Sequence, residues 1–384
     1  MSLKQPIYFD YAATTPVDPA VAKSMSACLT LDGNFANPAS RSHLFGWKAE
    51  EAVEHARAEL AGLINADPRE IVWTSGATEA SNLALKGLVE KKALQGAHII
   101  TSSIEHKSVL DVCAELEALG CEVSYVSPEC DGRVSIDTIK AAQRENTALV
   151  SLMHANNETG ALNDIAELGA WTREQGIFLH VDAAQSVAKI DVDVKALNID
   201  LMSISAHKMY GPKGQGALYV RRCPELELSA QMHGGGHERG MRSGTLATHQ
   251  IVGMGKAAEL ARARLPSEKQ RLQGLREELF EGLEGCEGIS HNGSFEHSVP
   301  GIVNLCFKGV EGEVLLLSLR ELAVSSGSAC MSATMAPSYV LAAMGLSEAD
   351  ALSSIRLSFG RFTRLDDIKQ AVAVLRRVYS SLAA

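Results

Sequence analysis

The chain has 384 residues, of which 46% are hydrophobic and 21% are charged, and its net charge is −10. This composition is typical of a soluble globular protein with room for two or more domains, and the negative charge argues against nucleic acid as the main partner, because that partner needs a basic face. No segment approaches the roughly 20 apolar residues of a membrane helix, and the N-terminus has no apolar run long enough for a secretion signal. We therefore expect no membrane partner and a cytoplasmic location.

The cysteines are scattered and include no CxxC pair. They are Cys28, Cys113, Cys121, Cys130, Cys223, Cys286, Cys306 and Cys330. This pattern argues against a disulfide framework and a structural zinc site, and we predict no metal. Most of these thiols are expected to be small buried hydrophobes. Cys330 differs, because the segment Ser325–Pro337 (SSGSACMSATMAP) is made of small and polar residues that cannot pack a core.

From about residue 70, short apolar runs alternate with amphipathic ones. The pattern predicts strands over 70–75, 98–103, 121–127, 148–154, 177–182, 199–205 and 216–222, and helices over 76–94, 106–120 and 162–176. Strands that alternate with helices indicate right-handed βαβ units and a mostly parallel sheet with helices on both faces, so the fold class is α/β.

After about residue 255 the pattern changes to long charged helices and shorter strands. We expect a helix from Ile251 through 257–285, strands over 301–307 and 354–360, and a last helix over 366–382. This predicts a smaller α+β domain. The expected division is a large domain of residues 16–260 and a small domain of 1–15 plus 261–384, with the segment around 325–337 carrying Cys330.

Ligands of a parallel sheet gather at the carboxyl ends of its strands, and four groups of polar residues follow predicted strands. They are Ser75-Gly76-Ala77-Thr78, Glu105-His106, Asp182 with Gln185, and Ser205-Ala206-His207-Lys208. Each group alone has an ordinary explanation: Ser75 or Thr78 caps a helix, the histidine is hydrogen-bonded, the aspartate pairs with an arginine, and the lysine ends a strand.

Together, the four groups are the parts of a pyridoxal 5'-phosphate site. The helix start after Gly76 suits the phosphate. Asp182 would keep the pyridine nitrogen protonated, His106 is the right size to stack on the ring, and Lys208 would hold the cofactor covalently and move protons at the substrate's α-carbon. The order of these residues along the chain is hard to obtain by chance.

Longer stretches extend this pattern. They are FDYAATTPVDP, GNFANPASRSH, TSGATEASNLALKG, EHKSVLD, HANNETG, HVDAAQS, SAHKMYGPKG, MHGGGHERGMRSGT, SSGSAC and SIRLSFGRFT. With them the sequence resembles, almost end to end, the cysteine desulfurases of the iron–sulfur cluster assembly type (IscS/NifS type). These belong to the class V aminotransferase group of fold type I pyridoxal phosphate enzymes.

The resemblance implies a role for each matching residue. Lys208 would carry the cofactor, with Asp182 at the ring nitrogen, Gln185 at the ring hydroxyl and His106 stacked on the ring as acid and base. The phosphate would be held by Ala77, Thr78, Ser205 and His207, and by Thr245 from the partner subunit of a homodimer. Substrate would be oriented by Asn157 and by Arg356 at its carboxylate, with Asn37 a further candidate.

The implied reaction converts L-cysteine to L-alanine. The Cys330 thiolate would take the sulfur as a persulfide and pass it to an acceptor protein, such as an iron–sulfur scaffold or a sulfur carrier for tRNA thiolation. Relatives that serve a scaffold usually have a tail after the last helix, whereas this sequence ends at Ala384, so the choice of acceptor stays open.

Other interpretations remain. A selenocysteine lyase or another class V aminotransferase-fold enzyme would share the cofactor, and activity of a Cys330→Ser variant would discriminate, because selenium chemistry can proceed without that thiol. A non-catalytic scaffold would not need Lys208, Asp182 and His106, which are all present. His233 and His237 stand four residues apart, as in a helical metal pair, but the glycines between them disfavour a helix.

Overall fold

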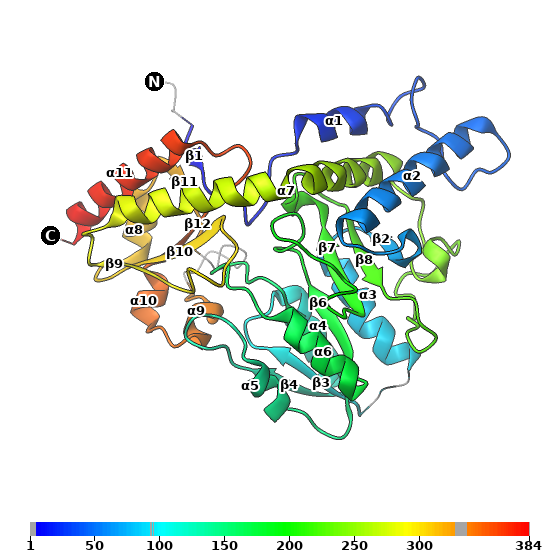
Figure 1. The fold of residues 1–384 in the computed structure, drawn as a ribbon, viewed down its shortest axis with the longest axis horizontal. Helices are drawn as coiled ribbons and strands as arrows, with labels where there is room; N and C mark the ends of the chain where they lie inside the picture. Colours follow the sequence, from blue (N-terminus) through cyan, green and yellow to red (C-terminus); the bar gives the residue numbers. More distant parts are fainter. Residues whose placement is uncertain (1–4, 93, 95, 327–335, 384) are drawn as a thin grey trace.

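A computed structural model describes residues 5–92, 94, 96–326 and 336–383. Its central element is a seven-stranded sheet in the order β2-β8-β7-β6-β5-β3-β4 (Figure 1). The strands are β2 (Ile71–Thr74), β3 (His98–Ser102), β4 (Glu122–Val126), β5 (Thr147–Met153), β6 (Phe178–Asp182), β7 (Leu201–Ser205) and β8 (Gly216–Val220). Each predicted strand of this region is present within a few residues of its expected bounds.

Six strands of the sheet are parallel and β8 runs against them. Strands β4, β3, β5, β6 and β7 pair in parallel, whereas β8 is antiparallel to both β7 and β2. The β7–β8 connection consists only of residues 206–215, and a parallel crossover needs about a dozen residues or more. The predicted mostly parallel α/β sheet is therefore confirmed, with one reversed strand.

Helices cover both faces of the sheet, which is why its strands are almost continuously apolar. Helices α3 (Ala77–Lys91) and α4 (Lys107–Ala118) pack on one face, in a cluster that includes Leu85 and Val112. The other face is covered by α2 (Leu44–Leu63), α6 (Ile165–Gln175) and the start of α7. Helices α1 (Pro19–Ser26), α2 and α5 (Ile136–Ala141) were not predicted.

A second group of elements has its own apolar cluster, which contains Phe9, Phe307 and Leu357. Its antiparallel sheet has the order β12-β10-β9, and β1 pairs in parallel with β11. The strands are β1 (Ile7–Tyr8), β9 (Ile289–His291), β10 (Ile302–Phe307), β11 (Leu322–Ala323) and β12 (Ser354–Ser358). The helices are α8 (Gly312–Ser318), α9 (Tyr339–Ala343), α10 (Glu348–Leu352) and α11 (Leu365–Leu382).

Helix α7 (Thr248–Leu283) joins the two groups and crosses the molecule (Figure 1). Its first half buries Ile251 and Met254 against the large sheet, and its second half buries Leu279 in the smaller cluster. In the part of the chain that the structure describes, no helix combines the length and the apolar character needed to span a membrane. The exact domain boundaries stay a prediction.

Candidate active site

A cavity of about 660 Å³ lies at the carboxyl edge of the large sheet. Its lining includes the following predicted site residues: Ala77, Thr78, His106, Asn157, Asp182, Gln185, Ser205, His207, Lys208 and Arg356. Asn37 and Thr245 are exposed and do not line it within this chain. Cys330 lies outside the described residues.

One wall of the cavity is the start of α3. Its N-cap is Gly76, with no side-chain cap, so the alternative that Ser75 or Thr78 caps this helix is wrong. The first N–H groups of a helix have no intrahelical partner and carry a partial positive charge. Glu79, in the first turn, accepts a hydrogen bond from the Ser75 N–H at 2.8 Å and pairs with Arg242 at 2.8 Å. Its charge is compensated, so the helix start favours an anion.

Lys208 and His207 follow β7 in a short 3₁₀ turn (Ala206–Lys208) at the cavity. The His207 Nδ1 lies 3.1 Å from the Thr14 Oγ1. Burial, followed by the charges of Lys208, Lys213 and Lys189, lowers the pKa of His207 to about 4. Its ring is therefore neutral at pH 7 and can donate one hydrogen bond without repelling the lysines.

His106 is the N-cap of α4. Its Nδ1 accepts a hydrogen bond from the Ser108 N–H at 3.1 Å and lies 2.8 Å from the Ser108 Oγ. Burial and then the Lys208 charge lower the pKa of His106. The backbone bond to Nδ1 places the proton of the neutral ring on Nε2.

Asp182 ends β6 and is 5% exposed. Its Oδ1 accepts a hydrogen bond from the Ala184 N–H at 2.9 Å. A carboxylate buried this deeply is costly unless a cation or a donor meets it. Asp182 is therefore suited to hold a protonated nitrogen inside the cavity.

Arg356 lies on β12, on the side of the cavity that the smaller group of elements provides. Its Nη1 donates to the Asn157 carbonyl at 2.7 Å and its Nη2 to the Asp10 Oδ1 at 2.7 Å. The Arg356 Nε, the Asn157 Oδ1 and the Ser325 Oγ are buried without a hydrogen-bond partner among the described residues. Buried polar atoms are normally satisfied, so this wall is suited to a polar ligand.

The described residues on either side of 327–335 are tied to the cavity wall. On one side, Ser325 exchanges backbone hydrogen bonds with Arg356 at 2.7 and 3.2 Å. On the other, the Ser338 Oγ donates to the Glu158 Oε2 at 2.5 Å and the Tyr339 hydroxyl donates to the Glu105 carbonyl at 2.7 Å. The chain therefore leaves and re-enters the described structure beside the cavity.

Sequence reasoning did not single out several lining residues, namely Asp10, Thr14, Glu158, Lys213 and Tyr339. All of these except Tyr339 stand inside stretches that carried the resemblance, which was the available signal. Over the described ranges, no three His, Cys, Asp or Glu side chains gather as metal ligands. Residues 232–237 are not helical, so His233 and His237 lack the geometry of a helical pair.

Comparison with known proteins adds the family. The family profile described as Aminotransferase class-V matches residues 7–371. The cysteine desulfurase IscS of Ectopseudomonas mendocina (strain ymp) is 58% identical over 380 residues, which cover 99% of this chain and 94% of the relative. A solved structure described as a NifS-like protein has a TM-score of 0.89 and 33% identity and covers 99% of this chain and 100% of that one.

A second solved structure, described as SspA in complex with cysteine, has a TM-score of 0.83. It is 42% identical to this chain and covers 93% of this chain and 100% of that one. These matches extend over both groups of elements, so the similarity includes both walls of the cavity.

Proposed function

This chain belongs to the class V aminotransferase family and, within it, to the cysteine desulfurases, and on that premise we propose how its own residues divide the work. The enzyme depends on pyridoxal 5'-phosphate and converts L-cysteine to L-alanine, as the resemblance predicted. The single observation that supports the residue roles is the cavity itself, because an uncapped helix start, Lys208, Asp182 and Arg356 all line it.

The residues present fit the cofactor. The uncapped start of α3 at Ala77 and Thr78 would hold the phosphate, together with Ser205 and His207. A Cβ on Gly216 would lie 2.5 Å from the Gly76 Cα, so only glycine at position 216 lets this cradle form. When bound, the cofactor supplies an electron sink for the α-carbon.

The remaining cofactor contacts would come from residues at the ends of β3, β6 and β7. Lys208 would bind the cofactor through its amine, Asp182 would keep the ring nitrogen protonated, and Gln185 would face the ring hydroxyl. His106 would stack on the ring and, with Lys208, move protons at the substrate. The neutral state that burial favours for His106 suits proton exchange near neutral pH.

Arg356 would orient the substrate through its carboxylate. Its guanidinium is held by Asn157 and Asp10, and its buried Nε has no partner among the described residues. A carboxylate there would satisfy that donor in a charge-assisted pair. Asn157 would use its unpartnered Oδ1 on the substrate's polar groups.

Cys330 would accept the sulfur. Its thiolate would attack the substrate sulfur, the carbon–sulfur bond would break, and a persulfide would form on Cys330 while the carbon skeleton takes up protons as alanine. An acceptor protein would then receive the outer sulfur. The anchoring of Ser325 and Tyr339 at the cavity wall supports this role, because it ties both flanks of the cysteine segment beside the reaction.

A paired assay tests this proposal. Wild type should release equal amounts of alanine and sulfide from L-cysteine in the presence of a reductant. Cys330→Ser should still perturb the visible cofactor band on adding cysteine but release no sulfide. Cys130→Ser, which removes an exposed thiol elsewhere, is the matched control and should behave as wild type. Sulfide release by Cys330→Ser at the wild-type rate would favour a selenocysteine lyase instead.

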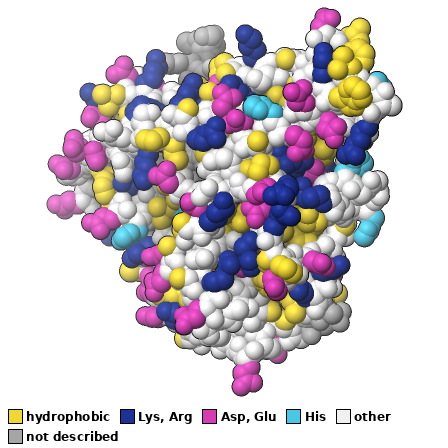
Figure 2. Space-filling view, turned by 45° about the vertical axis from the view of Figure 1, so that its right-hand side comes forward, with side chains coloured by type: hydrophobic (Ala, Val, Ile, Leu, Met, Phe, Trp, Pro, Cys, Tyr) yellow, Lys and Arg dark blue, Asp and Glu magenta, His cyan; other side chains and the backbone are white. Residues whose placement is uncertain are grey.

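We further propose a homodimer that works in the cytoplasm with an acceptor protein. Large apolar side chains are exposed around the connection of α1 and α2: Leu29, Leu31, Phe35, Leu44, Phe45 and Trp47. Hydrophobic side chains gather at the upper right of Figure 2, where this connection lies. Such a patch is typical of an interface, and Thr245 and Asn37 stay predictions for a site completed by the partner.

Sedimentation velocity tests the dimer. We expect a dimer that Phe45→Glu dissociates, because a buried charge without a partner opposes association. Leu119→Glu, an exposed leucine outside the patch, is the control and should leave the dimer intact. A wild-type monomer with full cofactor occupancy would contradict the proposal. We also propose that the large domain consists of residues 16–260 and the small domain of residues 1–15 plus 261–384.

A further inference from the structure

A further lysine, Lys189, lies beside the active-site cavity and has no role in the proposed chemistry. Lys189 belongs to the turn after β6, and its amine donates a hydrogen bond to the Gln185 Oε1. The preceding residue, Ala188, is buried with φ of 65°, in the left-handed region. That conformation costs an alanine about 1–2 kcal/mol and persists only where the surroundings impose it. The turn therefore places Lys189 at an energetic cost.

The hydrogen bonds of Gln185 determine which way its amide points. Gln185 is 3% exposed, and its Nε2 donates to the Ala12 carbonyl at 2.8 Å. The Ala12 carbonyl can only accept, and the Lys189 amine donates to the Gln185 Oε1, so both contacts fit the same amide orientation. One Nε2 hydrogen remains, on a side chain that lines the active-site cavity. Lys189 therefore keeps the carbonyl end of the amide occupied and its N–H end available.

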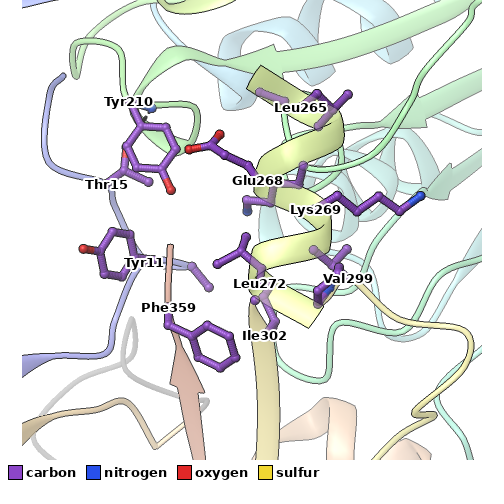
Figure 3. Close-up of a pocket in the computed structure, with 15 residues that line it drawn as sticks. Tyr11, Thr15, Tyr210, Leu265, Glu268, Lys269, Leu272, Val299, Ile302 and Phe359 are labelled. Carbon is purple, nitrogen blue, oxygen red and sulfur yellow. Dashed lines mark hydrogen bonds between the residues drawn. The ribbon is translucent and has the colours of Figure 1, made fainter. Parts of the chain in front are cut away.

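Lys189 also lines a separate cavity of about 20 Å³, with room for about one water. Figure 3 shows its walls: a stretch of α7 with Leu265, Glu268, Lys269 and Leu272 on one side, and Tyr11 and Thr15 on the other. The Lys269 amine points away from the cavity (Figure 3). Ala12 lines both cavities, so the Lys189–Gln185–Ala12 group forms the partition between them.

The charges around Lys189 leave Gln185 as its acceptor. Glu268, the carboxylate of the small cavity, pairs with Arg361 at 2.6 Å. Lys189 forms no ion pair within the described ranges. Burial and the charges of Lys208 and Arg356 lower its pKa well below the usual range. Burying a lysine without a counter-ion costs free energy. The contact that Lys189 makes there is its hydrogen bond to the Gln185 amide.

We propose that Lys189 is a positioning residue that fixes the Gln185 amide so that its N–H, and not its carbonyl, faces the ring oxygen of the cofactor. The inference rests on the proposed placement of Gln185 at that oxygen. A donor stabilises negative charge on the ring oxygen, so the nitrogen that links Lys208 to the cofactor loses its proton at lower pH. A flipped amide would present a carbonyl and have the opposite effect.

A spectral pH titration of the holoenzyme tests the proposal. The visible band of the Lys208-bound cofactor changes with protonation, and its midpoint is measured without any turnover. Lys189→Met keeps the length of the side chain but removes the donor, and should raise the midpoint by about 1 pH unit. Lys189→Arg keeps a donor and should stay near wild type. Lys269→Met, the other lysine of the small cavity, should leave the midpoint unchanged.

Measurements in a Gln185→Leu background distinguish a wrong placement of Gln185 from a wrong role for Lys189. Gln185→Leu alone should raise the midpoint, and adding Lys189→Met should then have no further effect, because the two act as one unit. If Gln185→Leu has no effect, the placement of Gln185 in the proposed function is wrong. If Gln185→Leu shifts the midpoint but Lys189→Met does not, Lys189 does not position the amide.

Two further outcomes would overturn the inference. An equal Lys189→Met shift with and without Gln185 would mean that the lysine acts directly through its charge. A Lys189→Arg midpoint displaced as far as that of Gln185→Leu would show that a donor at position 189 does not hold the amide. If Lys189→Met does not fold, the Lys189→Arg titration tests the proposal instead.

Discussion

At the scale of single residues, a buried ion pair holds the segment around Glu238 against α2 and β2. Arg57 and Glu238 pair at 2.8 Å, with side chains only 5% and 2% exposed. Arg57 also donates to the Ile71 carbonyl at 2.9 Å, and Glu238 accepts from the Trp73 N–H at 2.8 Å. Removing one member of such a pair leaves an uncompensated buried charge, which is far costlier than losing an exposed pair.

Glu238→Gln should therefore destabilise the protein by about 3–5 kcal/mol. Glu54→Gln is the matched control, because Glu54 pairs with the same arginine but its side chain is 57% exposed, and it should cost less than about 1 kcal/mol. Urea unfolding of both variants measures the difference. Equal losses would mean that burial of the Glu238 pair does not determine its contribution.

Residues that sequence reasoning selected lie together where topology concentrates side chains, although their roles stay predictions. Asp182, Lys208 and His106 were predicted because each follows an apolar strand, and parallel strands bring their ends to one edge. The Arg57–Glu238 pair gave no such signal, because 181 positions separate its members. A charge with a distant partner is indistinguishable in sequence from one on a solvated surface.

At the scale of elements, β8 and the start of α3 are pressed together. A Cβ on Gly216 would lie 2.5 Å from the Gly76 Cα and 2.6 Å from the Ile204 carbonyl oxygen. The reversed direction of β8 makes its first residue, Gly216, the neighbour of Thr74 at the end of β2. The start of α3, which would bind the phosphate, can take this position only because Gly216 has no side chain.

Gly216→Ala should weaken cofactor binding. Overpacking costs about 1–3 kcal/mol, and if the helix start moves, that cost becomes a roughly ten- to hundredfold higher dissociation constant. Gly274→Ala in α7 is the control, because its Cβ would meet nothing within 4 Å. Equilibrium titration of the apoprotein with pyridoxal phosphate measures both, and unchanged affinity for Gly216→Ala would refute the argument.

The direction of β8 was not predicted, although the short connection Ala206–Gln215, with its glycines and proline, was a usable sign. Helix α2 was missed for another reason. It has a modest apolar face that packs mainly on α7, and the expected alternation of strands and helices was counted only from residue 70. Strands were easier to predict because burial on both faces makes them continuously apolar.

At the scale of the whole molecule, buried histidines couple stability to pH. Burial lowers the pKa of His154, His180, His207 and His291 to about 4 each. The unfolded chain binds protons at these sites from about pH 6.5 downward, whereas the folded chain does not until about pH 4. The contribution of these neutral histidines to the unfolding free energy is complete above pH 6.5 and is lost progressively as the pH falls toward 4.

We therefore expect unfolding free energy to fall steeply between pH 6.5 and 4. His180, fully buried between Ser151 and Ser203, should account for about 3 kcal/mol of this loss. His180→Asn should be less stable than wild type at pH 7, but its unfolding free energy should fall less on acidification. His55→Asn, at an exposed site, should keep the wild-type slope. Urea unfolding across this range checks both, and a wild-type slope for His180→Asn would contradict the assignment.

The pairing of β1 with β11 has a consequence for biosynthesis. Ile7 is in register with Leu322, and Asp10 forms a bridge with Ser358. On the ribosome, the first segment emerges long before these partners exist, so Asp10 and Ala12 cannot take their places in the cavity wall until β11 and β12 have been synthesised. Pairings of such large sequence separation form late. The nascent chain can assemble most of its large sheet early, but this wall of the cofactor cavity is complete only after β12 has been synthesised.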